Sequence, residues 1–212
     1  MIDLSSLAAF ALVALGLVCS PGPNMIYLIS RSITQGRWAG FISLLGVIMG
    51  FVFYMCCAAF GITALLMAVP FAYQAIQWAG AAYLLYLAWQ AIKPGAANIL
   101  QPRTDLPIDG PRKLFLMGFL TNLLNPKIAV LYLSLLPQFI DPARGNVLMQ
   151  SVTLGAVQIA VSFTVNLMIV FAAGSVAAWF ARRPTWVVVQ RWLMATVLGA
   201  LAVKLVFEKR AT

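Results

Sequence analysis

The segment Ser20-Pro21-Gly22-Pro23-Asn24 interrupts an apolar stretch that begins at Leu4 and resumes at Met25. Each proline removes a backbone donor and clashes with the preceding turn, and the glycine adds backbone freedom, so an α-helix cannot run through this segment. Irregular backbone persists at membrane depth only where protein buries it or where it lines a polar cavity. The break therefore indicates a functional site, provided that the flanking segments lie in a membrane.

The composition places the chain among the membrane proteins. Of the 212 residues, 63% are hydrophobic and 9% are charged, whereas a soluble domain carries about 25% charged residues. The net charge of +9, spread between apolar segments, fits the cytoplasmic loops of a membrane protein better than a nucleic-acid surface. The sequence contains no histidine, which removes the commonest metal ligand and general base. We therefore predict a polytopic membrane protein in a lipid bilayer, with no nucleic acid, metal or cofactor.

Six segments meet the requirement of about 20 mostly apolar residues for a spanning helix. They run from about 4–33, 39–68, 71–92, 114–137, 147–179 and 186–207. The first and the fourth contain proline breaks, at Pro23 and Pro126, so each half has a broken helix, a long helix and a shorter one. Three spans per half place the second half in the membrane with opposite polarity, as in the inverted repeats of many secondary transporters.

The predicted fold is therefore all-α, a polytopic membrane protein with six transmembrane helices. These helices form two inverted three-helix repeats in which helices 1 and 4 are broken by proline. The whole chain, 1–212, is one transmembrane domain, with repeat 1 over about 1–93, a polar linker over about 94–112 and repeat 2 over about 113–212.

The basic residues predict the orientation. Eight of them follow the odd-numbered spans: Arg31, Arg37, Lys93, Arg103, Arg112, Lys113, Arg182 and Arg183. Three lie on the opposite side: Arg144, Lys209 and Arg210. Because cytoplasmic loops carry the excess of Lys and Arg, the linker is expected in the cytoplasm and both termini outside it.

Small residues four apart, Gly36 with Gly40 and Gly46 with Gly50, lie at the start of the second span. Such spacing lets helix backbones approach closely in lipid, and we expect packing within the monomer. The three cysteines occur in apolar segments without a CxxC pair and are expected to be small buried side chains.

Lys127 is the charged residue that most needs a function, because it lies inside an apolar segment where an ammonium costs at least about 2.5 kcal/mol. It either extends to an interface or faces a cavity in which it attracts an anionic group. Asn24, Asn122 and Asn125 lie beside the two breaks, where an amide can satisfy interrupted backbone or contact a ligand. The free N–H groups at the start of the helix after Asn24 favour a carboxylate.

No carboxylate lies within a predicted span, since all five acids are in tails or connections. This absence disfavours a strongly cationic cargo and leaves no buried carboxylate as a proton carrier. Gln158 and Asn166 in the fifth span either line the same cavity or bond between helices. An intramembrane enzyme is disfavoured, because the spans lack the histidines and clustered acids of such enzymes. A passive channel stays open as an alternative.

Two motifs resemble signatures of the LysE/RhtB family of amino-acid exporters. One is Ser20-Pro21-Gly22-Pro23-Asn24, followed by Gln35-Gly36-Arg37. The other is the segment from Gly118 to Lys127, which reads GFLTNLLNPK. The likeness extends over essentially the whole chain, including its length and its six hydrophobic segments.

This resemblance implies a permease of the bacterial inner membrane that exports amino acids or close derivatives and is driven by the proton-motive force. Exporters of basic amino acids in the family rely on acidic residues in the membrane. Because this chain has none in its predicted spans, the neutral branch, with homoserine, threonine or leucine as substrate, is favoured. A permease for another small metabolite is the alternative, and a homodimer is compatible with the family.

The predicted substrate-binding residues are those of the two breaks. They are Ser20, Pro21, Gly22, Pro23, Asn24, Asn122, Asn125, Pro126 and Lys127. No residue is assigned a catalytic role, because the expected function is transport.

Overall fold

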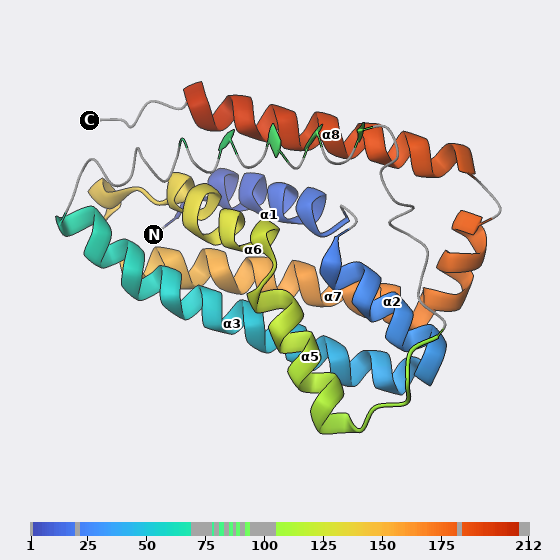
Figure 1. Ribbon diagram of the computed structural model, residues 1–212. Helices are drawn as coiled ribbons and strands as arrows, with labels where there is room; N and C mark the ends of the chain where they lie inside the picture. The colour runs from blue at the N-terminus through green and yellow to red at the C-terminus, as the bar shows by residue number, and fades with distance from the viewer. Residues whose placement is uncertain are drawn as a thin grey trace.

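A computed structural model describes residues 2–19, 22–68, 78, 81–82, 85–86, 88–89, 92–93, 105–181 and 184–207. All regular structure in these residues is helical (Figure 1), which confirms the predicted all-α class. The third predicted span lies largely outside the described residues, as do Ser20 and Pro21 of the first motif.

The helices begin and end close to the predicted spans. The first predicted span comprises α1 (Leu4–Cys19) and α2 (Pro23–Gln35), and the second predicted span is α3 (Arg37–Ala68). The second half contains α5 (Pro111–Leu123), α6 (Pro126–Val130), α7 (Val147–Ala181) and α8 (Pro184–Phe207). Proline is the first residue of α2, α5, α6 and α8, a position where its missing N–H costs no hydrogen bond.

The fourth predicted span continues beyond α6 with irregular helical turns. A π-helical turn, Leu131–Leu135, follows α6 directly, and the 3-10 turn Leu136–Phe139 completes the segment. A second 3-10 turn, Pro142–Arg144, precedes α7. Turns of these types interrupt the regular i to i−4 bonding and often occur near functional sites.

Within the described residues, two helices are long and apolar enough to cross a membrane, over Arg37–Gly61 and Val147–Ser175. The number rises to four if each bent pair is one span. The pairs are Leu4–Cys19 with Pro23–Gln35 and Pro111–Leu123 with Lys127–Phe139, each bent by 55°. Both predicted breaks are therefore present as sharp bends.

The two long helices, α3 and α7, extend along the molecule and contact each other, while α5 packs on α3, and α1 and α2 pack on α7 (Figure 1). Glycines make the contact between α3 and α5 very close. A Cβ atom on Gly46 would collide with the carbonyl oxygen of Phe115, and one on Gly118 would collide with that of Ser43. The expected packing of the glycine-rich helix within the monomer is confirmed for Gly46.

The expectation for the cysteines was wrong. Cys19, Cys56 and Cys57 are exposed on the surface of the helices. Hydrophobic periodicity could not locate them, because the lipid-facing and core-facing sides of a membrane helix are equally apolar. The core that does form is made of large side chains such as Phe10, Leu28, Phe51, Tyr132 and Leu154.

Candidate functional site

The two helix breaks, more than one hundred residues apart in sequence, meet in space. Gly22 lies at the first break and Lys127 at the second, and a Cβ atom added to Gly22 would stand 3.1 Å from the Lys127 Nζ atom. A larger residue at position 22 would therefore compete with the ammonium group for space. Pro23 starts α2 and Pro126 starts α6 on the two sides of this contact.

Lys127 is held by the end of α1. Its Nζ atom donates a hydrogen bond of 2.9 Å to the carbonyl oxygen of Leu17, in the last turn of that helix. The last four carbonyls of a helix lack partners within it and carry partial negative charge, so they favour a cation. This contact explains how the chain accommodates an ammonium between apolar helices.

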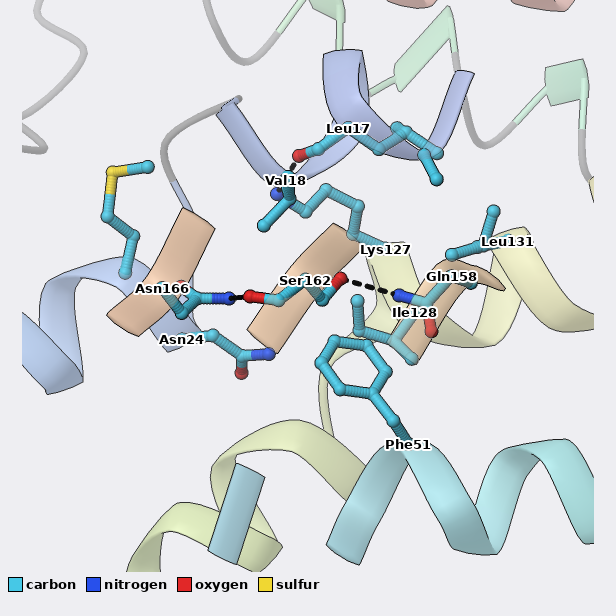
Figure 2. A pocket seen from close by; sticks show the side chains of 12 residues that line it. Leu17, Val18, Asn24, Phe51, Lys127, Ile128, Leu131, Gln158, Ser162 and Asn166 are labelled. Carbon is cyan, nitrogen blue, oxygen red and sulfur yellow. Dashed lines mark hydrogen bonds between the residues drawn. The ribbon is translucent and has the colours of Figure 1, made fainter. Parts of the chain in front are cut away.

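A cavity opens beside the Lys127 side chain (Figure 2). Its polar wall is formed by Asn24, Lys127, Gln158, Ser162 and Asn166. Its apolar wall comes from α1, α2, α3 and the segment after Lys127: Ala14, Leu17, Val18, Met25, Phe51, Ile128 and Leu131. The space open to the centre of a water molecule is about 20 Å³, enough for about one water and too little for an amino acid in this conformation.

One wall of the cavity is a row of buried polar side chains on α7, at positions 158, 162 and 166. The spacing of four places them on one face of the helix. Gln158 Nε2 donates to Ser162 Oγ (2.8 Å), and Asn166 Nδ2 donates to the carbonyl of Ser162 (2.8 Å) (Figure 2). The Tyr132 hydroxyl donates to Gln158 Oε1 (2.7 Å) from the turn after α6. Gln158 and Asn166 thus both line the cavity and form hydrogen bonds.

The three asparagines of the breaks have different environments. Asn125 caps α6, because its Oδ1 accepts a hydrogen bond of 3.1 Å from the Lys127 backbone N–H. Asn122 is fully buried against Gly50 of α3, and neither atom of its amide has a partner among the described residues. Asn24 is 8% exposed, lines the cavity, and its Oδ1 likewise has no partner there.

Of the predicted site residues, the structure therefore brings Asn24 and Lys127 together at the cavity, and Gly22 lies beside the Lys127 side chain. Asn122 and Asn125 are close in sequence to Lys127 but do not line the cavity. Sequence reasoning did not assign Ser162, Leu17 and Phe51 to the site. The spacing of four from Gln158 to Asn166 could have identified Ser162. Nothing local distinguishes Leu17 or Phe51 from other apolar residues of their helices.

A second polar cluster ties the end of α2 to the segment before α5. Arg31 Nη2 pairs with Asp109 Oδ2 at 2.6 Å, and both side chains are almost fully buried. Gln35 bonds both backbone groups of Asp109, by its Nε2 to the carbonyl and its Oε1 to the N–H. The hydrogen bond from Lys113 and the charge of Arg31 hold the pKa of Asp109 below its ordinary value. This pairing could not be predicted from sequence, because Asp109 lies in a polar connection.

The described residues contain no group of three or more His, Cys, Asp or Glu side chains that could hold a metal ion. The structural features so far define a helical protein with candidate membrane spans, in which residues of two bent helix pairs line a partly polar cavity. Residues 15–209 match the model of a known family, described as the LysE type translocators. The chain belongs to this family of membrane translocators, as its two motifs indicated.

Similar proteins occur in bacteria. An uncharacterized membrane protein of Pseudomonas aeruginosa is 29% identical over 170 residues, which are 77% of each chain. A homoserine/homoserine lactone efflux protein of Salmonella typhimurium is 31% identical over 171 residues, which are 81% of this chain and 82% of that protein. No solved structure matches the chain.

Proposed function

We propose that this protein is a secondary transporter of the bacterial inner membrane that exports neutral amino acids or their close derivatives, driven by the proton-motive force. The single observation that supports this most is the cavity between the two helix breaks, with Asn24 on one side and Lys127 on the other. Broken helices near the middle of a membrane form the substrate sites of many secondary transporters.

The groups around this cavity fit the two charges of an amino acid. The N-terminal end of α2 has free N–H groups that favour the carboxylate of the substrate. The carbonyl of Leu17 and the Asn24 Oδ1 are acceptors that suit an ammonium. The substrate would therefore lie across the first break, with its carboxylate at α2 and its ammonium near the end of α1.

The side chain of the substrate would face α7. Gln158, Ser162 and Asn166 present uncharged polar groups, which suit a small hydroxylated side chain such as that of homoserine or threonine. No carboxylate lines the cavity in the described residues, so lysine and arginine are disfavoured. The efflux protein of Salmonella typhimurium, whose name gives homoserine and its lactone as cargo, supports the same substrate class.

We further propose six spans in two inverted repeats, with both termini in the periplasm. Two ion pairs support the assignment of the connecting segments to opposite sides of the membrane. Asp3 pairs with Arg144 at 3.5 Å near the N-terminus, and Arg31 pairs with Asp109 at the far end of the broken helix. The small cavity volume supports a closed conformation that must open to each side in turn. A homodimer is compatible with this arrangement.

Counterflow in proteoliposomes tests the proposal. Vesicles loaded with unlabelled L-homoserine should take up labelled L-homoserine with saturable kinetics, and L-threonine should compete whereas L-lysine should not. Flux that follows the gradient without saturation would instead establish a channel. Absence of counterflow with every amino acid, in a protein shown to be folded by its thermal transition, would refute the assigned substrate class.

A further inference from the structure

The break between α1 and α2 holds a cation that belongs to the protein itself. The Lys127 Nζ atom donates a hydrogen bond to the Leu17 carbonyl at the C-terminal end of α1 and lies 3.1 Å from the place that a Cβ atom on Gly22 would occupy. The ends of interrupted helices commonly coordinate the coupling ion of a transporter, because their last carbonyls carry partial negative charge. Here a lysine ammonium occupies that place.

Lys127 is also the ionisable side chain in the cavity wall. The groups that α2, α3 and α7 present to the described cavity are uncharged: Asn24 and Met25, Phe51, and Gln158, Ser162 and Asn166. From α1, the Cys19 thiol is near enough to interact electrostatically with Lys127, although it does not line the cavity. Lys127 and Cys19 are therefore the two candidates for a proton carrier at this site.

An amino-acid substrate brings its own ammonium to the same place. With the substrate carboxylate at the start of α2, its ammonium approaches the Leu17 carbonyl and the Asn24 Oδ1, which has no partner among the described residues. Two ammonium groups at one carbonyl repel each other, and such repulsion favours the neutral form of an amine. The end of α1 can therefore hold the protonated lysine or the substrate, but not both.

We propose that Lys127 is the proton carrier of this exporter and that its proton and the ammonium of the substrate compete for the end of α1. This inference rests on the proposed export function and goes beyond it by assigning the coupling step to one residue and one carbonyl group.

One transport cycle exchanges the proton of Lys127 for the ammonium of the substrate. On the cytoplasmic side the N–H bond of the Lys127 ammonium breaks, the proton passes to water, and the substrate ammonium takes the Leu17 carbonyl. On the periplasmic side the substrate leaves, and the neutral Lys127 amine takes a proton from water. One amino acid moves out for each proton that moves in, and the site never needs a buried carboxylate.

Binding measurements on the purified full-length protein test this scheme. We would titrate L-homoserine calorimetrically in two buffers of different ionisation enthalpy, between about pH 5 and 7, below the ordinary pKa of an amine. The expected result is release of one proton per substrate bound and an affinity that rises about tenfold per pH unit. Binding without proton release and without pH dependence would overturn the inference while leaving the export function intact. If no amino acid binds, both proposals fail.

Three variants identify the group that titrates. Lys127→Met removes the proton and should bind L-homoserine with an affinity that does not change with pH, and it should exchange labelled substrate but lose accumulation driven by a pH gradient. Lys127→Arg keeps a permanent cation at the end of α1 and should lose binding at every pH tested. Cys19→Ser is the matched control and should keep the wild-type proton release.

The opposite results would be equally clear. Proton release that persists in Lys127→Met, or disappears in Cys19→Ser, would overturn the assignment to Lys127. Wild-type binding by Lys127→Arg would show that a fixed cation does not exclude the substrate, which contradicts the competition. The thermal transition of each variant identifies loss of fold, and the wild-type proton count tests the scheme even if one variant does not fold.

Discussion

Replacement of Gly46 by alanine tests the close packing of α3 on α5 that places the second break. The added Cβ would collide with the Phe115 carbonyl oxygen and come within 2.9 Å of the Phe119 backbone nitrogen. Both are backbone atoms, so relief requires movement of a whole helix. Overpacking of this kind lowers the free energy of unfolding by about 1–3 kcal/mol. The better helix propensity of alanine offsets about 1 kcal/mol of this loss. Because the clash is with backbone atoms, we take the upper end of the overpacking range and expect a net decrease of about 2 kcal/mol in the free energy of unfolding.

For a chain of this size, that loss corresponds to a decrease in Tm of about 4–8 °C. The measurement is thermal unfolding of the purified protein in detergent. Gly61→Ala is the matched control on the same helix, because a Cβ at Gly61 meets nothing within 4 Å in the described structure. It should leave Tm unchanged or raise it. Equal Tm values for the two variants would refute the close contact between α3 and α5.

Three further perturbations address the polar groups. Asp109→Asn should lower Tm, because it leaves the buried Arg31 guanidinium without its carboxylate. Lys113→Gln is the control and should change Tm little, because the Lys113 side chain is 61% exposed. Equal changes in Tm for the two variants would contradict a stabilising buried ion pair. A hydrogen bond from the Ser6 backbone lowers the pKa of Asp3 from 3.8. A hydrogen bond from the Lys113 side chain lowers the pKa of Asp109 from the same value. Their stabilisation is therefore present above pH 3.8 and is lost as the pH falls through the lowered values, so Tm should decrease below about pH 4 in wild type and decrease less in Asp109→Asn. Asn24→Ala should leave Tm unchanged, because the Asn24 Oδ1 atom has no hydrogen-bond partner among the described residues. The same variant should weaken L-homoserine binding at least about tenfold. A large decrease in Tm with unchanged binding would make Asn24 a structural residue.

The breaks were predictable because proline acts locally. A proline removes a donor and clashes within its own turn, so Pro23 and Pro126 mark helix starts whatever surrounds them, and both do start helices. The helix-capping alternative for Asn125 was predictable for the same reason, since its bond to the Lys127 backbone spans two residues.

The groups that bind the polar side chains near the breaks could not be predicted, because they are distant in sequence. The bond from Lys127 to the Leu17 carbonyl joins residues 110 positions apart, and a backbone carbonyl leaves no signature in the residue type. The burial of Asp109 likewise depends on Arg31, 78 positions away. Exposure of the cysteines depends on which side of a uniformly apolar helix faces lipid, which periodicity does not record.

The central claim is that the substrate occupies the cavity between the two breaks, and protection of a single cysteine from labelling tests it most directly. In a background with Cys19, Cys56 and Cys57 replaced by serine, Ser162→Cys places a thiol in the cavity wall. Thr164→Cys places one on the exposed side of α7, two residues away. Both would be labelled with N-ethylmaleimide with and without saturating L-homoserine.

In variants that retain counterflow, L-homoserine should slow the labelling of Ser162→Cys and leave that of Thr164→Cys unchanged. Equal labelling of Ser162→Cys with and without a substrate that the same variant transports would contradict the account, because the substrate would then pass through another part of the protein.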